Sequence, residues 1–199
     1  MMNWKPQETS LISRQEDSPA NIINFHTNED ATGGFLNKRG DSPANTINFH
    51  TNEDTAGGFV KFVSISPEET FNTGLSLAAL LIPGSVVALK GDLGSGKTML
   101  AKGIIKGLGI NENITSPTYT IISEYQHSPA LYHIDVYRLN NDKDFEDIGG
   151  PEIINSGGIS IIEWSERIPN SIPANAITIS LEITGHSTRK IVINGIKSL

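Results

Sequence analysis

The sequence lacks cysteine altogether and has little positive charge. Without cysteine, disulfide bonds, thiolate catalysis and zinc–thiolate sites are excluded. With 15 Lys and Arg against 22 Asp and Glu, the formal net charge is −7. This balance argues against a DNA-binding surface or any broad, non-specific surface for nucleic acid. It leaves open a role on RNA that is reached through partner proteins.

Long apolar runs are also missing. The longest one lies within residues 75–82, far short of the roughly 20 residues that a membrane-spanning helix needs. The first eight residues, MMNWKPQE, do not form the apolar core of a signal peptide. We therefore expect a cytoplasmic protein with no membrane association.

The first sixty residues contain a duplicated segment. Residues 17–35 and 41–59 are nearly identical, with one substitution and one swapped Ala-Thr pair between them. Two copies are too few to stack into a solenoid. The segment is rich in Asn, Asp, Ser and Gly, so it has few side chains to bury. We predict that residues 1–60 are a disordered or loosely attached extension and that residues 61–199 form the folded domain.

Two functional interpretations of this extension stay open beside a plain solvated segment. Its histidines and acids are of metal-ligand types, although their spacing matches no established ligand pattern. Alternatively, the extension is an arm that docks on another protein. The residues of the metal interpretation are His26, Glu29, Asp30, His50, Glu53 and Asp54.

Residues 91–98, GDLGSGKT, match G-x-x-x-x-G-K-[ST], the phosphate-binding loop of P-loop proteins. The flanking segments match the context that this motif requires. Residues 85–90 are typical of a short buried strand, and residues 99–108 carry apolar side chains at helical spacing. Strand, glycine loop and helix in this order predict a nucleotide-binding site rather than a plain turn.

The chemistry of this loop suits a phosphate ligand. Glycines allow backbone angles and close approaches that a β-carbon forbids. Successive N–H groups can then point at phosphate oxygens at the start of the following helix. The Lys97 amine would reach the β- and γ-phosphates of ATP, and the Thr98 hydroxyl would bind Mg²⁺. The predicted nucleotide-binding residues of the loop are Gly91, Asp92, Leu93, Gly94, Ser95, Gly96, Lys97 and Thr98.

The segments around the loop predict an α/β domain. Residues 61–65 alternate like a strand. The helix predicted from Pro67 to Ile82 begins with the capping box of Ser66 and Glu69. Further strands are predicted over residues 119–125, 131–138 and 158–164, with closing antiparallel strands over 176–183 and 189–193.

Two of the predicted strands carry an acid near their ends, Asp135 and Glu163. A P-loop nucleoside triphosphatase needs such an acid beside Mg²⁺ or beside the attacking water. Ligands of open α/β sheets bind at the carboxyl ends of the strands, so both acids are suitably placed. Two merely exposed carboxylates are the alternative, and the spacing does not decide which acid binds metal and which orients water.

Four other residues each allow two interpretations. Thr118 lies in residues 116–118, a hydroxyl-rich proline turn that could also sense the γ-phosphate as switch loops do. His133 is either catalytic or a packed strand histidine. Trp164 either stacks on the base of the nucleotide or forms an aromatic edge of the core. Arg189 is either a phosphate contact or an ordinary surface residue.

Taken in order, these segments resemble the TsaE family, formerly called YjeE. Its members are small P-loop ATPases of the bacterial pathway that makes threonylcarbamoyladenosine in tRNA. The resemblance covers about residues 61–198, and residues 1–60 have no counterpart in it. Ser95 and Met99 stand where the family commonly has Ala and Thr, and neither touches the predicted chemistry. The matching segments are GDLGSGKT at 91–98, SPTYT at 116–120, HIDVYRL at 133–139 and IEW at 162–164.

The resemblance implies an α/β fold of the P-loop NTPase type, with three layers and a mixed parallel and antiparallel sheet. It implies an Mg²⁺-dependent ATPase that is slow alone and is stimulated by TsaB- and TsaD-type subunits, with tRNA contacted only indirectly. Carried onto this chain, Lys97, Asp135 and Glu163 are the catalytic residues. Both acids and Thr98 surround Mg²⁺, while Thr118 and Trp164 lie against the nucleotide.

Two alternatives remain at this point. A P-loop kinase for a small molecule would use the same phosphate loop, but kinases of this kind usually carry a lid rich in arginine. Only Arg138, Arg167 and Arg189 follow the loop. The other alternative is a nucleotide-dependent binding module with negligible hydrolysis.

Overall fold

The computed structural model describes residues 22–27, 46–51 and 59–196. Within the duplicated segment it contains two strands, β1 (Ile22–Thr27) and β2 (Thr46–Thr51), which pair in parallel with equivalent positions of the two copies in register. The sequence predicted no strand there. Ile, Phe and Thr favour strands even inside a polar segment. The remainder of the extension and the side chains of the proposed metal ligands lie outside the described residues, so the division at residue 60 stays a prediction.

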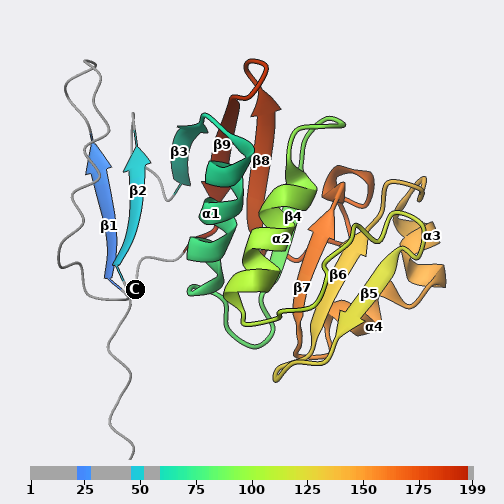
Figure 1. The fold of residues 1–199 in the computed structure, drawn as a ribbon. Coiled ribbons are helices and arrows are strands. Elements are labelled where there is room, and N and C mark those ends of the chain that lie inside the picture. The colour runs from blue at the N-terminus through green and yellow to red at the C-terminus, as the bar shows by residue number, and fades with distance from the viewer. Residues whose placement is uncertain (1–21, 28–45, 52–58, 197–199) are drawn as a thin grey trace, which may run out of the picture.

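The main sheet has seven strands in the order β3-β9-β8-β4-β7-β6-β5 (Figure 1). Strands β8, β4, β7 and β6 run parallel to one another. Strand β9 is antiparallel to β3 and β8, and β5 is antiparallel to β6. The predicted mixed sheet is thereby confirmed. Its bounds are β3 (Phe59–Ser64), β4 (Val86–Lys90), β5 (Ile122–Tyr125), β6 (Leu131–Asp135), β7 (Ile159–Glu163), β8 (Ile177–Ile183) and β9 (Arg189–Asn194).

Helices cover both faces of this sheet, which gives the predicted three layers. One face packs against α1 (Pro67–Ala78) and α2 (Lys97–Gly107), and this layer contains the larger hydrophobic core (Figure 1). The other face packs against α3 (Asp142–Asp147) and α4 (Gly150–Ile154) over strands β6 and β7. A short 3₁₀ helix, η1 (Ser165–Arg167), follows β7.

Helix α1 begins as the sequence predicts and ends four residues earlier. The Ser66 hydroxyl accepts a hydrogen bond from the Glu69 N–H at 3.1 Å, and the Glu69 carboxylate accepts one from the Ile65 N–H at 2.7 Å. After Ala78 the chain turns through bonds to the third preceding residue. Proline disfavours the helical conformation in the residue before it, and Pro83 therefore excludes a helix that runs through Ile82.

Helix α2 is held against α1 at three glycines, Gly74, Gly103 and Gly107, and this contact sets the position of the phosphate loop. A β-carbon on Gly103 would lie 2.1 Å from the Phe71 carbonyl oxygen, and one on Gly74 would lie 2.3 Å from the Leu100 carbonyl oxygen. The two backbones therefore approach more closely than any larger residue permits. On its inner side, α2 buries Leu100, Ile104 and Ile105 completely. No helix among the described residues is long and apolar enough to cross a membrane.

Candidate nucleotide-binding site

The predicted site residues converge on one edge of the sheet. Strands β4, β7 and β6 are parallel, so their carboxyl ends lie together. Antiparallel strands β5 and β9 begin at that same edge, which brings the loop before β5 and the first residue of β9 to it. This topology brings five chain segments together: the phosphate loop after β4, the ends of β7 and β6, the loop before β5 and the start of β9.

The phosphate loop has the backbone shape that its sequence predicts. Gly91, Gly94 and Gly96 have φ values of 137°, 77° and 104°, which L-residues with a side chain rarely adopt. A β-carbon on Gly91 would also lie 2.2 Å from the Leu181 carbonyl oxygen. Gly96 is the N-cap of α2 and supplies no side-chain acceptor. The first amides of α2 therefore remain available for an anionic ligand.

Lys97 is almost fully buried and lies inside the loop. Its Nζ donates to the carbonyl oxygens of Gly91 at 2.5 Å and Asp92 at 2.9 Å. The same nitrogen lies 3.6 Å from the centroid of the Trp164 ring. Burial lowers the pKa of Lys97, and the charges of the surrounding acids, Glu166 foremost, oppose this shift. A phosphate bound in the loop would therefore offer this amine negatively charged oxygens in place of the two carbonyl oxygens.

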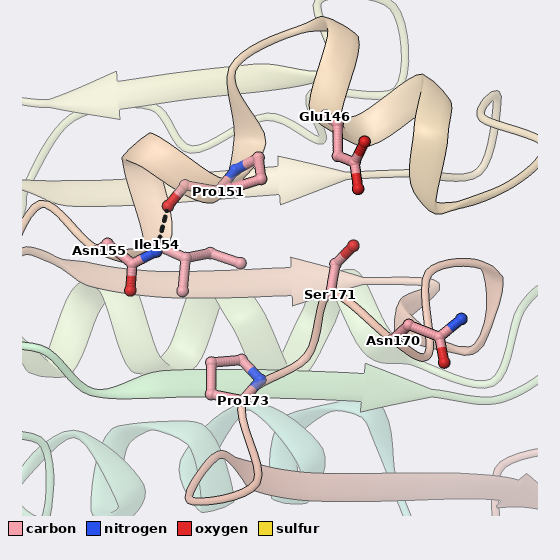
Figure 2. A pocket seen from close by; sticks show the side chains of 7 residues that line it. All are labelled: Glu146, Pro151, Ile154, Asn155, Asn170, Ser171 and Pro173. Atoms are coloured by element: carbon pink, nitrogen blue, oxygen red, sulfur yellow. Dashed lines mark hydrogen bonds between the residues drawn. The ribbon is translucent and has the colours of Figure 1, made fainter.

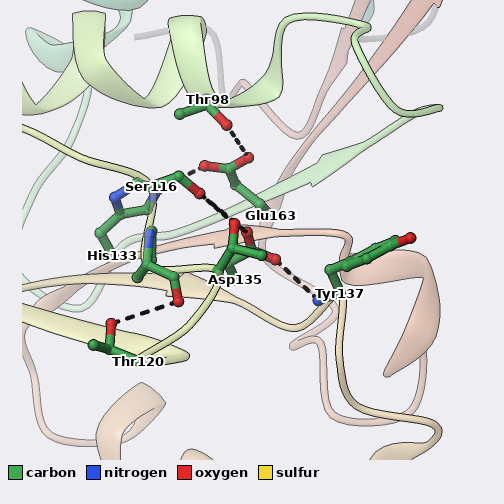
Figure 3. Close-up of polar contacts among 9 residues, drawn as sticks. Thr98, Ser116, Thr120, His133, Asp135, Tyr137 and Glu163 are labelled. Carbon is green, nitrogen blue, oxygen red and sulfur yellow. Dashed lines mark hydrogen bonds and ion pairs between the residues drawn. The ribbon is translucent and has the colours of Figure 1, made fainter.

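Glu163 connects the loop to the neighbouring strand (Figure 3). The Thr98 hydroxyl donates to Glu163 Oε2 at 2.7 Å. The other oxygen, Oε1, lies 2.8 Å from His133 Nε2, and both side chains are buried. Because a carboxylate only accepts hydrogen bonds, this nitrogen carries the proton. His133 is therefore a buried, hydrogen-bonded partner of Glu163, and its Nδ1 has no hydrogen-bond partner among the described residues.

Asp135 lies opposite Glu163 in the sheet register but contacts a different segment (Figure 3). Its Oδ2 accepts hydrogen bonds from the hydroxyls of Thr118 at 2.6 Å and Ser116 at 3.2 Å. Its Oδ1 accepts the Tyr137 N–H at 2.9 Å. This last bond, from a residue two positions further on, is typical of an Asx turn. It ends β6 at Asp135 and corrects the strand predicted through residue 138.

The loop before β5 forms the predicted turn and also contacts an acid, and the sensing of a γ-phosphate by Thr118 stays a prediction. The Ile121 N–H donates to the Pro117 carbonyl at 2.6 Å, and the Ile121 carbonyl accepts the Asp135 N–H at 2.8 Å. Ile121 has a φ of 67°, which is rare for a β-branched residue. This turn delays the strand predicted from residue 119 until Ile122.

Trp164 directly follows β7 and has a φ of 62°, so the strand ends one residue earlier than predicted. Its ring contacts the Lys97 amine on one side and Tyr137 at a centroid distance of 4.8 Å. Arg167 lies 5.1 Å from the Tyr137 ring centroid. Trp164 is therefore part of an aromatic and cationic group beside the loop, and stacking on a base remains a prediction.

Arg189 contacts the phosphate loop from its outer side. Its Nε donates to the Ser95 carbonyl at 3.1 Å and its Nη2 to the Gly94 carbonyl at 3.0 Å. The sequence suggested either a phosphate contact or an ordinary surface residue; these bonds show that Arg189 is more than an ordinary surface residue, and a contact with phosphate stays a prediction. Glu166 was also missed, although its Oε1 accepts the Gly91 N–H at 3.3 Å. No local pattern signals either contact, since both join segments far apart in the sequence.

The side chains at this edge suit a magnesium nucleotide. One hydroxyl and two carboxylates offer the hard oxygen ligands that Mg²⁺ prefers. Among the described residues, no three His, Cys, Asp or Glu side chains form a ready-made metal cluster. In nucleotide-binding proteins, phosphate oxygens and water usually supply the remaining ligands of Mg²⁺.

A hollow lies away from this edge, between the α3–α4 segment and the chain after η1 (Figure 2). One of its walls is fixed by Asp142, whose Oδ1 accepts the N–H and the hydroxyl of Ser171, both at 2.7 Å. None of the predicted site residues lines this hollow. Its lining residues are Glu146, Pro151, Ile154, Asn155, Asn170, Ser171 and Pro173.

Several known proteins are similar to this chain. The family model "Threonylcarbamoyl adenosine biosynthesis protein TsaE" matches residues 64–191. A protein of Treponema pallidum (strain Nichols) named "tRNA threonylcarbamoyladenosine biosynthesis protein TsaE" is 45% identical over 120 residues, which are 60% of this chain and 89% of that protein. The protein of the same name from Bacillus subtilis (strain 168) is 39% identical over 60% of this chain and 75% of its own length. The crystal structure of Bacillus subtilis YdiB matches with a TM-score of 0.60 and 34% identity, over 70% of this chain and 86% of that one.

Proposed function

The chain belongs to the TsaE family, and on this premise we propose that it binds and hydrolyses ATP within the machinery that makes threonylcarbamoyladenosine in tRNA. The relatives reported above carry that modification in their names. We further propose that it acts with TsaB- and TsaD-type subunits, and that tRNA is reached only through them. The transfer of the threonylcarbamoyl group then belongs to the partners.

The observation that supports an ATPase most strongly is the 2.7 Å hydrogen bond between the Thr98 hydroxyl and Glu163. It joins the threonine of the phosphate loop to the acid at the end of the adjacent parallel strand. A metal ion bound by the hydroxyl would lie beside this carboxylate, as P-loop nucleoside triphosphatases require. A glycine-rich turn without this chemistry would have no reason to face a buried acid.

We assign nucleotide binding to the loop and to the start of α2. The amides of Gly94 and of residues 96–98 would donate to the phosphates, whereas the Ser95 amide already donates to the Asp92 carbonyl. Lys97 would exchange the carbonyls of Gly91 and Asp92 for the β- and γ-phosphates. Thr98 and Glu163 would hold Mg²⁺. When bound, Mg²⁺ would neutralise charge on the β- and γ-phosphates during transfer.

The two acids then have separate tasks. Glu163 is oriented by the His133 N–H, which fixes one oxygen and leaves the other toward Thr98. Asp135 holds the loop of Ser116 and Thr118 through its Oδ2. A loop tied to an acid in this way can respond to the γ-phosphate, as switch loops do. We therefore place the control of turnover in residues 116–121 and metal binding at Glu163.

This arrangement explains why the lone protein should hydrolyse ATP slowly. Asp135 already accepts three hydrogen bonds from this chain, two on Oδ2 and one on Oδ1, which leaves at most one acceptor position, on Oδ1, to orient the attacking water. Switch-type P-loop proteins gain large rate factors when a partner completes the site. We propose that TsaB- and TsaD-type subunits complete it here.

The test is ATP turnover by the full chain, measured alone and with a TsaB–TsaD pair. We expect slow turnover alone and a clear stimulation by the pair. Lys97→Ala should weaken ATP binding, whereas Lys106→Ala, at the far end of the same helix, should not. ATP binding without hydrolysis in either condition would favour the binding module. Phosphoryl transfer to a metabolite would favour the kinase.

A further inference from the structure

Arg189 is the first residue of β9, and its guanidinium group joins two loops. Toward the phosphate loop, it donates from Nε to the Ser95 carbonyl at 3.1 Å and from Nη2 to the Gly94 carbonyl at 3.0 Å. Toward its own hairpin, Nη1 donates to the carbonyls of Thr188 at 2.9 Å and Gly185 at 3.2 Å. All three guanidinium nitrogens thus face backbone carbonyls of the protein.

These bonds restrain the direction of two peptide groups of the loop, and in the first of them, between Gly94 and Ser95, the Ser95 N–H also donates to the Asp92 carbonyl at 3.1 Å. In a trans peptide, the C=O and the following N–H point in opposite directions. With the Ser95 carbonyl held by Arg189, the Gly96 N–H must therefore point to the other side of the loop. Gly96 itself has a φ of 104° and adds no restraint of its own. Arg189 supplies from outside the restraint that the glycines lack.

Arg189 and Lys97 hold different carbonyls of the same loop. Lys97 contacts Gly91 and Asp92 from within, at the position where phosphates would bind. Arg189 contacts the carbonyls of Gly94 and Ser95 through Nη2 and Nε, and of its five N–H groups only the second one on Nη2 has no acceptor among the described residues. Arginine keeps its charge at every physiological pH, and its planar fork matches two acceptors at once. Its bonds can therefore persist when Lys97 changes partners.

We propose that Arg189 is a positioning residue that clamps the phosphate loop in its binding shape without contacting the nucleotide. The proposal rests on the proposed function only in taking the loop as a nucleotide site. It predicts that Arg189 contributes equally to the binding of every nucleotide that carries the β-phosphate. A ligand of the γ-phosphate would instead discriminate ATP from ADP.

The experiment measures the dissociation constants of ATP and ADP for the full chain by calorimetry. We expect Arg189→Ala to weaken both by about tenfold, which equals about 1.4 kcal/mol. Arg189→Lys keeps the charge but not the fork, and it should weaken both by about threefold, since lysine acts as a point charge. Lys190→Ala is the matched control, because this neighbour pairs with Glu182 at 2.8 Å and does not contact the loop.

A loss confined to ATP would overturn the clamp in favour of a γ-phosphate contact, and unchanged constants for both nucleotides would also overturn it. If Arg189→Ala fails to fold, Arg189→Lys carries the same comparison, because it retains the charge and most of the apolar stem.

Hydrogen exchange of the free protein gives a second readout that needs no nucleotide. Exchange of the amides of residues 94–97 should be faster in Arg189→Lys than in wild type and unchanged in Lys190→Ala. Equal exchange in all three proteins would refute the clamp. If wild type binds neither ATP nor ADP, the proposed function fails, and the exchange comparison still decides whether Arg189 holds the loop.

Discussion

Glu163 and Asp135 occupy equivalent places on adjacent parallel strands, yet they belong to different parts of the site. Glu163 joins a helix start and a buried histidine through Thr98 and His133. Asp135 joins a loop and a turn through Thr118, Ser116 and the Tyr137 N–H. The two acids therefore differ in their hydrogen-bond partners and not in their position on the sheet. We assign metal binding to one and the control of turnover to the other on this basis.

The largest effect is expected when Glu163 loses its charge. Glu163→Gln keeps the size of the side chain, so ATP binding should change little. Turnover should fall by roughly a hundredfold or more, since a correctly held metal ion contributes several kcal/mol of transition-state stabilisation. Steady-state ATPase assays with the stimulating partners, together with calorimetric ATP binding, measure the two quantities. Glu124→Gln on edge strand β5 is the matched control, and an equal loss in both variants would contradict a special role for Glu163.

A smaller effect is expected at Asp135. Asp135→Asn replaces one accepting oxygen with a donating NH₂ group and loses the charge that strengthens all three hydrogen bonds. We expect turnover to fall by about tenfold, with faster hydrogen exchange over residues 116–121, since charge-assisted bonds are worth about 1.5–3 kcal/mol. Exposed Asp147 on α3 serves for comparison. If Asp135→Asn also abolishes the dependence of activity on Mg²⁺ concentration, the separation of the two acids is wrong.

His133 tests whether Glu163 needs its orienting partner. His133→Ala leaves a buried carboxylate oxygen without its donor, which should lower the free energy of unfolding by about 1–3 kcal/mol. His133→Gln can restore an N–H donor and should recover part of the loss. Chemical denaturation measures both. Ser160→Ala is the control, because the buried Ser160 hydroxyl has no hydrogen-bond partner among the described residues. A similar loss of unfolding free energy in Ser160→Ala would show that His133 contributes only packing.

The smallest effect is expected at Thr118. Thr118→Val keeps the shape of the side chain and removes one hydrogen bond to Asp135, worth about 1 kcal/mol. Partner-stimulated turnover should fall a few-fold while the turnover of the lone protein stays the same. Thr120→Val removes only a longer bond of 3.5 Å to the Pro117 carbonyl and provides the reference. A greater loss of stimulated turnover in Thr120→Val would show that another residue of the loop, and not Thr118, controls turnover.

Prediction from sequence succeeded where the cause lies close by along the chain. The capping box of Ser66 and Glu69 formed as predicted, because its two partners are three residues apart. Element ends were less predictable. Ile121 takes a φ of 67°, and nothing in a β-branched side chain signals such a conformation. The predicted strand therefore begins later, and the loop gains the turn that carries Thr118 to Asp135.

The contacts that join separate segments escaped prediction for a different reason. Thr98 and Glu163 are 65 residues apart, and Arg189 and Gly94 are 95 apart. Whether such residues meet depends on strand order and register, and a slip of one residue turns every side chain to the opposite face. The sequence nominated both acids as site residues, and it could not pair them with their donors.

What the sequence determined by itself was the phosphate loop, because the positive φ values of Gly91, Gly94 and Gly96 are local demands that only glycine meets readily. Only the tertiary structure could show the hydrogen bonds of His133 to Glu163, of Thr118 to Asp135 and of Arg189 to the phosphate loop. The physical reason is topological. Parallel strands collect their carboxyl ends at one edge, antiparallel neighbours begin there, and no single segment of the chain contains that edge.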